Sequence, residues 1–268
     1  MIIFDGKKFA AERELVLAKK VLDLHKKGIY PKLAAILIGE DVASVGYVQI
    51  KKKAALRVGC EVDDYRVSVY KDYKQALGLI KFLNSDPGIH GIMIQLPLPL
   101  LWKKYKSNFF NLISPEKDVD GHRTDSKFLP ATVGAIMSIL DQARVSRADN
   151  IAVVGSKGEV GKRLITHLES EKYKVTGSDK ADFKKSFDKN ADVIISATGN
   201  PDLIDGDMVK KDAVVIDVGY PMGDVNFKQV SKKAKFITPV PGGVGPVTVV
   251  SLMENLIEAA SVANKANF

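Results

Sequence analysis

The fold is decided by the stretch Ile151-Ala152-Val153-Val154-Gly155-Ser156-Lys157-Gly158-Glu159-Val160-Gly161-Lys162. A four-residue apolar run leads into three glycines spaced by three, and residues 163–168 continue with helical spacing. A short buried strand, a glycine turn and a helix are how a parallel sheet offers backbone N–H groups to a phosphate. The stretch therefore predicts an α/β domain that binds a nucleotide.

The glycine pattern departs from two phosphate-binding motifs. A dinucleotide fingerprint has glycine where this chain has Ser156. A Walker-type loop needs glycine at that position and Ser or Thr where Arg163 stands. Taken alone, the pattern also fits a tight strand-to-helix turn that binds nothing, and both interpretations stay open at this point.

Length and composition indicate a two-domain globular protein. A chain of 268 residues suits two domains of about 100–150 residues each, and 46% hydrophobic with 27% charged residues is ordinary for such domains. No apolar run approaches the ~20 residues that span a bilayer, and the N-terminus lacks the pattern of a signal peptide. The single cysteine, Cys60, excludes an internal disulfide and fits a reducing compartment. We therefore expect a cytoplasmic protein with no membrane partner.

The net charge of +8 favours an anionic ligand. A nucleic acid would satisfy that charge, but the lysines are spread along the chain in pairs, and only Lys51-Lys52-Lys53 forms a triplet. Paired lysines on amphipathic helices are usually solvated faces rather than a binding stripe. We therefore expect no nucleic-acid partner.

Apolar strands alternate with helices along both halves of the chain, which predicts two α/β domains, the second of Rossmann type, with a cleft between them. The expected domains are residues 1–133, joined by a C-terminal helix within 247–268, and residues 134–246. Strands are expected at 32–39, 61–69, 91–96, 151–154, 173–176, 192–197, 213–218 and 235–237. Helices are expected at 8–28, 45–58, 75–84, 133–143, 160–170, near 182–188 and at 247–264, with partial helix over 100–114.

Residues that follow the buried strands are the first candidates for a site, because ligands bind beyond the carboxyl ends of parallel strands. Tyr47 and Lys51 are one helical turn apart and share a face. A lysine in a partly dry site has a lowered pKa and acts as a base, although a solvated helix face is the alternative. Gln95 ends an apolar strand, where an unpaired amide costs about 1–3 kcal/mol; its amide is either satisfied structurally or presented to a ligand.

Two loops complete the candidates. Asp118 and Asp120 lie in a loop without a His or carboxylate cluster at ligand spacing, so we expect no metal. Residues 239–248 hold three prolines and three glycines. Prolines stiffen such a loop, while glycines let the backbone approach a ligand closely. The loop therefore suits a planar ring.

Five stretches together resemble the methylenetetrahydrofolate dehydrogenase/cyclohydrolase family, the bifunctional folate enzymes. They occur in family order over residues 39–262. They are Tyr47-Val48-Gln49-Ile50-Lys51 with Lys53-Ala54, Gly91-Ile92-Met93-Ile94-Gln95-Leu96-Pro97-Leu98-Pro99, Pro115-Glu116-Lys117-Asp118-Val119-Asp120-Gly121, Val215-Ile216-Asp217-Val218-Gly219, and residues 238–246 (Thr-Pro-Val-Pro-Gly-Gly-Val-Gly-Pro) with Thr248.

The resemblance implies oxidation of 5,10-methylenetetrahydrofolate to the methenyl compound with a nicotinamide cofactor, then hydrolysis to 10-formyltetrahydrofolate. It also implies a homodimer and a place in one-carbon metabolism and purine biosynthesis. Tyr47 would pack on the aromatic part of folate, Lys51 would be the catalytic lysine, and Gln95 its hydrogen-bonding partner. Asp120 would grip the pterin ring. Pro241 and Gly242 would also contact the substrate.

The residues expected at the cofactor are Gly155, Ser156, Lys157, Gly161, Asp179, Lys180, Gly219 and Tyr220. The family usually has Gly-Arg-Ser where this chain has Gly155-Ser156-Lys157. An acid about 20 residues beyond the glycine loop selects the ribose 2′-OH of NAD, whereas a cation accommodates the 2′-phosphate of NADP. Asp179 favours NAD, while Lys157 and Lys180 favour NADP. We expect NADP, with NAD as the alternative.

Residues 130–135 are a second departure, because the family's Pro-Cys-Thr-Pro-x-Gly is here Pro-Ala-Thr-Val-Gly-Ala. The departure concerns local packing more than chemistry.

Two other functions are weighed against the bifunctional enzyme. One is a monofunctional NAD-dependent methylenetetrahydrofolate dehydrogenase, against which the presence of Lys51, Gln95 and Asp120 counts. The other is a non-enzymatic nucleotide- or nucleic-acid-binding protein.

Overall fold

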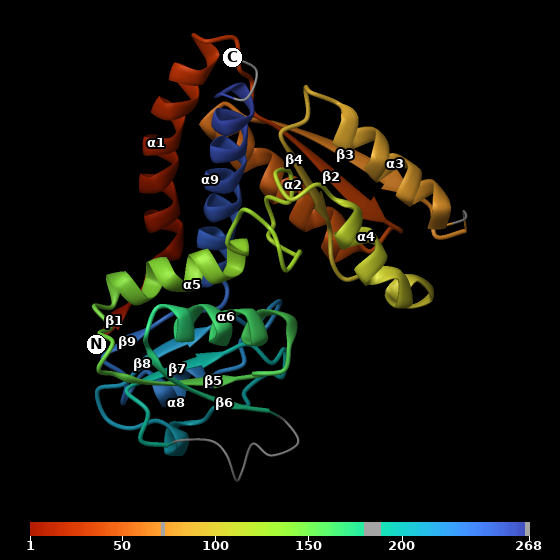
Figure 1. Ribbon diagram of the computed structural model, residues 1–268. Helices are drawn as coiled ribbons and strands as arrows, with labels where there is room; N and C mark the ends of the chain where they lie inside the picture. The colour runs from red at the N-terminus through yellow and green to blue at the C-terminus, as the bar shows by residue number, and fades with distance from the viewer. Residues whose placement is uncertain (71–72, 180–188, 266–268) are drawn as a thin grey trace. The chain divides into compact units, whose positions relative to one another are not determined.

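The computed structural model describes residues 1–70, 73–179 and 189–265 (Figure 1). The chain divides into two compact units. One contains Met1–Ala10 and Thr132–Thr248, and is called here the six-stranded unit. The other contains Ala11–Ala131 and the chain from Val249 onward, and is called the three-stranded unit. Both units are α/β, as the alternation of strands and helices predicts.

The six-stranded unit is built on one parallel sheet with the strand order β1-β9-β8-β7-β5-β6. The glycine loop follows β5, whose neighbours β6 and β7 lie on opposite sides. The strand order therefore reverses at β5, which is the point where open parallel sheets bind their ligands. The strands are β1 (Ile2–Ile3), β5 (Asn150–Val154), β6 (Lys174–Ser178), β7 (Val193–Ser196), β8 (Val214–Asp217) and β9 (Phe236–Ile237).

The first residues of the chain lie in this sheet, and not with the domain over residues 1–133 to which we expected them to belong. Strand β1 pairs in parallel with β9. The N–H of Ile2 donates to the carbonyl of Lys235 at 2.7 Å, and the ring of Phe4 lies 5.6 Å from that of Phe236. The pairing satisfies the edge of β9. A two-residue strand is too short to show a sequence periodicity.

The helices of this unit are α5 (Ala131–Gln142), α6 (Glu159–Ser170) and α8 (Phe227–Val230), with a 3-10 turn η2 (Gly206–Met208). Helix α6 buries Leu164 and Leu168, four residues apart on one face. The four-residue α8 and three-residue η2 are too short for the helical periodicity on which the sequence analysis relied. The helix expected near 182–188 lies outside the described residues.

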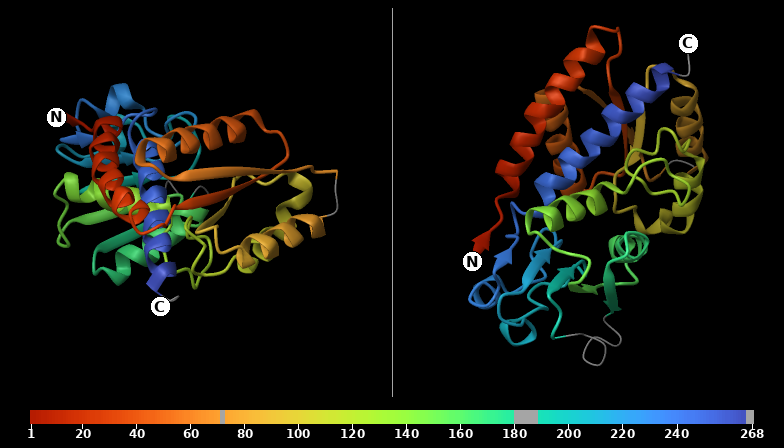
Figure 2. Two further views of the ribbon diagram at one scale, coloured as in Figure 1. Left: turned by 90° about the horizontal axis from the view of Figure 1, so that it is seen from above. Right: turned by 60° about the vertical axis from the view of Figure 1, so that its left-hand side comes forward.

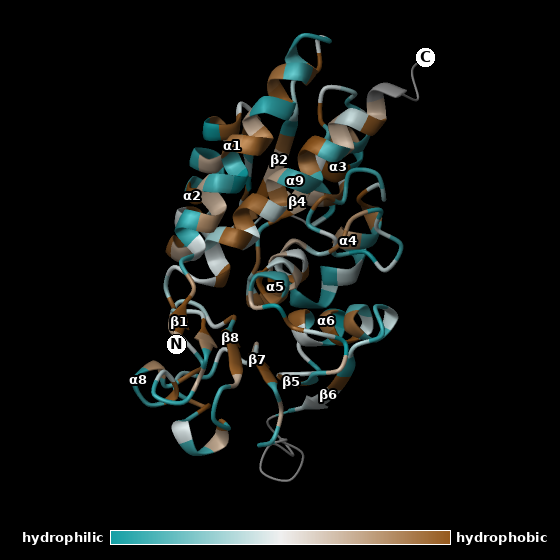
Figure 3. Cartoon of the chain, turned by 90° about the vertical axis from the view of Figure 1, so that its left-hand side faces the viewer, coloured by the Kyte–Doolittle hydropathy of each residue, from teal (hydrophilic) through white to brown (hydrophobic). Residues whose placement is uncertain are grey.

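The three-stranded unit has a parallel sheet of order β3-β2-β4. Its strands are β2 (Lys32–Ile38), β3 (Glu61–Val67) and β4 (Gly91–Ile94). Its helices are α2 (Val42–Val58), α3 (Tyr73–Ser85) and α4 (Lys106–Leu112), with a 3-10 helix η1 (Leu100–Tyr105). In the central strand β2 every residue after Lys32 is buried, because a parallel sheet is covered on both faces. Figure 3 shows this strand as an apolar ribbon.

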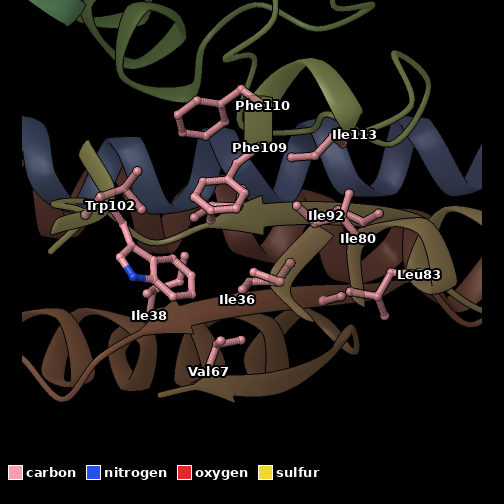
Figure 4. Packing of buried hydrophobic residues seen from close by; sticks show 14 of the residues in the cluster. Ile36, Ile38, Val67, Ile80, Leu83, Ile92, Trp102, Phe109, Phe110 and Ile113 are labelled. Carbon is pink, nitrogen blue, oxygen red and sulfur yellow. The ribbon is translucent and has the colours of Figure 1, made fainter. Parts of the chain in front are cut away.

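One apolar cluster fills the space between this sheet, α3 and the η1–α4 segment (Figure 4). Phe109 is fully buried, and the centroid of its ring lies 5.7 Å from that of Trp102. The segment after Pro99 therefore covers the sheet, which anchors the chain on both sides of the Gln95–Pro99 turn. The other members that Figure 4 labels are Ile36, Ile38, Val67, Ile80, Leu83, Ile92, Phe110 and Ile113.

Two long helices, α1 (Gly6–His25) and α9 (Val244–Lys265), lie side by side (Figures 1 and 2). Arg13 on α1 pairs with Glu254 on α9 at 2.7 Å. By length and composition α9 could cross a membrane over Val244–Ala263, which corrects the expectation that no apolar segment approached that length. More than half of that window is buried, as is usual for a core helix.

Lys117 ties the loop over residues 115–121 to the end of α3. Its ammonium donates to the carbonyls of Leu83 at 3.0 Å, Asn84 at 2.9 Å and Asp86 at 2.7 Å. Its own carbonyl accepts the N–H of Ile92 at 2.7 Å, on β4. One side chain thus supplies a donor to the Leu83 and Asn84 carbonyls, which lie in the last turn of α3 and have no intrahelical donor.

We expect Lys117→Met to lower the free energy of unfolding by about 1–3 kcal/mol, because it removes the ammonium donor of the Leu83 and Asn84 carbonyls. Thermal and urea denaturation would measure the loss. Lys81→Met, on the exposed side of the same helix, is the matched control and should change stability by less than about 0.5 kcal/mol. Equal stability of the two variants would contradict a stabilising role of the Lys117 hydrogen bonds.

Candidate functional site

Lys51 and Gln95 meet at the carboxyl end of β4. Lys51 lies on α2, and its side chain is buried with the residue only 5% exposed. The Nζ atom donates to Oε1 of Gln95 at 3.1 Å and contacts Sδ of Met93 at 3.4 Å. The Gln95 amide in turn donates to the carbonyl of Leu96 at 2.7 Å. The glutamine is therefore satisfied by the protein, and it directs the lysine amine.

Burial lowers the pKa of Lys51, and the nearby carboxylate of Asp120 partly offsets this effect. The amine also lies 5.1 Å from the ring centroid of half-buried Tyr47, within cation–π range. Its neighbours differ, since Lys52 pairs with Asp64 and Lys53 is exposed. Of the three consecutive lysines, Lys51 alone has the environment of a base; the alternative of a solvated helix face does not apply to it.

The two acids of the 115–121 loop have different tasks. Asp118 is 1% exposed, and its carboxylate accepts the N–H groups of His122 at 3.2 Å and Arg123 at 2.8 Å. The Asp120 carboxylate is only partly buried, and its Oδ2 lies 3.2 Å from Nε2 of His122. Asp118 therefore shapes the turn, and Asp120 is the acid that the turn presents.

The rest of the loop is held by close packing. Gly121 has φ +69°, and a Cβ atom there would lie 2.6 Å from the nitrogen of Pro130. Asn255 on α9 donates to the carbonyls of Val119 at 2.8 Å and Leu129 at 2.9 Å. The position of Asp120 thus depends on residues far along the chain. Within the described residues, no group of three His, Cys, Asp or Glu side chains could hold a metal ion.

Tyr47, Lys51, Gln95 and Asp120 thus all belong to the three-stranded unit. Sequence reasoning missed two neighbours of this group, Met93 and His122. Met93 reads as an ordinary residue of an apolar strand. His122 directly follows the acidic loop, which is the only sequence signal that could have found it.

In the six-stranded unit, the glycines of the loop after β5 allow an unusually close approach of backbone segments. Gly155 has φ +86°, and a Cβ atom there would lie 2.5 Å from the carbonyl oxygen of Ala197. A Cβ atom on Gly161 would collide with the carbonyl oxygen of Gly155. These are the tight turn and the close helix–strand packing that a pyrophosphate site at a helix N-terminus requires. The loop therefore fits a dinucleotide.

Ser156 replaces a fingerprint glycine, and β6 accommodates it. A Cβ atom on Gly177 of that strand would lie 2.7 Å from Cβ of Ser156 and 2.9 Å from Cδ1 of Ile165. The serine side chain therefore lies over the bare backbone of Gly177. The departure from the motif is compensated within the same unit, and the loop keeps its shape.

Asp179 follows β6, and its Oδ2 accepts the backbone N–H of Lys157 at 2.9 Å. The acid is thereby fixed beside the glycine loop, while the Lys157 side chain is exposed. Lys180 lies outside the described residues. Gly219 donates its N–H to Oδ1 of Asp217 at 2.8 Å, and Tyr220 is exposed.

Pro241 and Gly242 precede α9 and belong to the six-stranded unit, which does not contain Lys51. Their contact with a substrate remains a prediction. Cys60 is buried, and burial raises the pKa of its thiol to about 12, as expected for a small residue of the core.

Two family models cover nearly the whole chain. Residues 4–120 match the catalytic domain of tetrahydrofolate dehydrogenase/cyclohydrolase, and residues 130–264 match its NAD(P)-binding domain. The chain belongs to the tetrahydrofolate dehydrogenase/cyclohydrolase family. As a member of this family it is an enzyme, and it carries both of the family's domains.

Relatives of full length support this membership. The bifunctional protein FolD of Exiguobacterium sibiricum is 42% identical over 97% of this chain and 99% of its own. The crystal structure of the bifunctional FolD of Campylobacter jejuni has a TM-score of 0.90 at 34% identity, covering 98% of this chain and 99% of that one. The methylenetetrahydrofolate dehydrogenase-cyclohydrolase of Trypanosoma brucei, solved with NADP and an inhibitor, has a TM-score of 0.90 at 30% identity, covering 98% of both chains.

We expect Gly161→Ala to weaken binding of a reduced nicotinamide dinucleotide by at least about tenfold, which is 1.4 kcal/mol, because the added methyl group displaces the Gly155 carbonyl. Fluorescence titration would measure the affinity. The control is Gly78→Ala in α3, where an added Cβ meets no atom within 4 Å. That variant should be stabilised by up to about 1 kcal/mol. Unchanged affinity of Gly161→Ala would refute the assignment of the loop.

Proposed function

We propose that this enzyme oxidises 5,10-methylenetetrahydrofolate with NADP and hydrolyses the methenyl product to 10-formyltetrahydrofolate, within one-carbon metabolism. The observation that carries the proposal is the buried amine of Lys51, oriented by Gln95 beside Tyr47 and Asp120. The names of relatives support both reactions, since the Trypanosoma brucei protein is a dehydrogenase-cyclohydrolase. The family resemblance further supports a cytoplasmic homodimer that serves purine biosynthesis.

The three-stranded unit supplies groups of the kind that folate chemistry needs. The ring of Tyr47 offers an apolar face to an aromatic part of the substrate. The Asp120 carboxylate is an acceptor for the N–H groups on the edge of a pterin ring, where a charged acceptor makes stronger hydrogen bonds than a neutral one. Together these side chains would place the reacting carbon beside Lys51.

Hydrolysis requires a base near the methenyl carbon, which is cationic. Water bonds to that carbon through its oxygen and gives one proton to the neutral amine of Lys51. The bond from the carbon to N5 then breaks, N5 takes the proton that Lys51 holds, which restores the neutral amine, and the second water proton is released as the formyl group forms on N10. A lowered pKa increases the neutral fraction of Lys51, and Gln95 orients the amine without adding charge.

Oxidation requires a hydride acceptor, which the bound dinucleotide supplies. Backbone N–H groups of the glycine loop and the N-terminus of α6 would hold its phosphates. The exposed Lys157 would favour a 2′-phosphate, and the relative from Trypanosoma brucei was solved with NADP. The carboxylate of Asp179 would repel the 2′-phosphate, so it should weaken the preference for NADP over NAD.

Lys51→Met should abolish hydrolysis of methenyltetrahydrofolate while the fold is retained, because it removes the amine that Gln95 orients as the base. A coupled absorbance assay would follow reduced dinucleotide and methenyl compound together. We expect wild-type enzyme to show no accumulation of the methenyl compound and the variant to accumulate it. Lys53→Met, two residues away on the exposed side of α2, is the control. Normal hydrolysis by Lys51→Met would disprove the mechanism.

Asp179→Ser should raise the ratio of kcat/KM with NADP to that with NAD by about tenfold, or 1.4 kcal/mol, because it removes a carboxylate that repels the 2′-phosphate and binds the 2′-OH. Steady-state kinetics with both dinucleotides would test this. Asp207→Ser removes the same charge from an exposed position and should leave the ratio unchanged. A wild-type enzyme that prefers NAD would overturn the choice of NADP.

A further inference from the structure

Two buried acids lie at the carboxyl edge of the six-stranded sheet and have no part in the chemistry described above. Asp217 is the last residue of β8, and Asp224 lies in the loop that follows. They are 3% and 0% exposed, respectively. Acids are rarely buried without a task, because removing a charge from water costs free energy that its partners must restore.

Asp224 holds the segment that leaves the neighbouring strand β7. Its Oδ2 accepts the hydroxyl of Ser196 at 2.9 Å and the backbone N–H of Thr198 at 2.6 Å. A charged acceptor makes such N–H bonds shorter and stronger than a neutral one does. The residue between these two donors is Ala197, and the Ala197 carbonyl is the atom against which Gly155 of the glycine loop packs.

Asp217 holds Asp224 and the rest of the loop over residues 218–225. Its Oδ1 accepts the N–H groups of Gly219 at 2.8 Å and Asp224 at 3.0 Å, and its Oδ2 accepts that of Val225 at 2.9 Å. Burial raises the pKa of Asp217. A continuous set of hydrogen bonds thus connects the exits of β7 and β8.

The remaining oxygen of Asp224, Oδ1, is buried and has no hydrogen-bond partner among the described residues. An unsatisfied buried oxygen costs on the order of 1–3 kcal/mol, which offsets part of the stability gained from the two hydrogen bonds to Oδ2. Retaining such a group is understandable when its placement of the backbone serves a function.

We propose that Asp224 is a positioning residue for the dinucleotide. Its carboxylate fixes residues 196–198 against the glycine loop, while Asp217, which accepts the backbone N–H of Asp224, fixes the loop over residues 218–225. Both segments follow strands at the edge where a parallel sheet binds a dinucleotide. The proposal rests on the function proposed above, and it extends the binding site to a residue that touches no ligand.

The two activities of the enzyme provide an internal control. Hydrolysis depends on Lys51 in the three-stranded unit and requires no hydride acceptor, whereas oxidation requires the dinucleotide. A defect confined to positioning of the dinucleotide should therefore spare hydrolysis. A general loss of folded protein should lower both activities.

Asp224→Asn is the principal variant, because it removes the charge and nearly preserves the volume. We expect its Kd for NADPH, measured by fluorescence titration, and its KM for NADP to rise about tenfold (1.4 kcal/mol), with hydrolysis of methenyltetrahydrofolate unchanged. Ser196→Ala removes only one of the two bonds to Oδ2, so a smaller rise of about threefold is expected. Asp207→Asn, at an exposed site, should change neither quantity.

An unchanged Kd in Asp224→Asn would overturn the proposal, and so would a parallel loss of hydrolysis and dinucleotide binding. If Asp224→Asn does not fold, Ser196→Ala decides the question by the same two measurements. The NADPH titration needs no folate. Failure of wild-type protein to turn over folate would therefore count against the proposed function and leave the test of Asp224 intact.

Discussion

The burial of the Lys51 amine is the constraint on which the three-stranded unit depends. An ammonium group removed from water is costly, so the fold must provide partners that tolerate its neutral form. Those partners, Gln95 and Met93, come from β4, and the lysine comes from α2. This environment therefore exists only when α2 is packed against β4. Structure and chemistry share one requirement here, since the same burial that lowers the pKa fixes the helix against the sheet.

Most acids near the two candidate sites serve the backbone rather than the chemistry. The carboxylates of Asp118 and Asp217 accept N–H groups of the turns that follow them, and that of Asp224 accepts the N–H of Thr198. Asp120 differs because its neighbour Asp118 has already shaped the turn. Loops that carry functional groups must be rigid, and loops without regular structure achieve this by giving buried carboxylates their backbone donors. The acidic motif is thus largely a scaffold for one presented side chain.

The sequence predicted those parts of the fold that depend on local pattern. The apolar runs of β2 and β5 and the glycines after β5 were recognisable from the sequence. Burial on both faces of a sheet requires apolar residues, and a tight turn requires glycine. The hydrogen bonds of Lys117 were not recognisable, since their acceptors lie 31–34 residues away in sequence. Strand β1 escaped notice because its partner, β9, is more than 200 residues distant. The roles of Tyr47, Lys51, Gln95 and Asp120 came from family resemblance, and the structure adds the contacts that make those roles physically reasonable.

The absence of a side chain at Gly177 is what makes room for the side chain of Ser156. A Cβ atom at 177 would collide with that of the serine, so residue 177 must stay glycine while residue 156 carries a side chain. The structure of the glycine loop thus depends on a residue outside its motif, Gly177 on the edge strand β6. Anyone who transplants this loop into another dinucleotide-binding protein must transplant the glycine on the neighbouring strand as well.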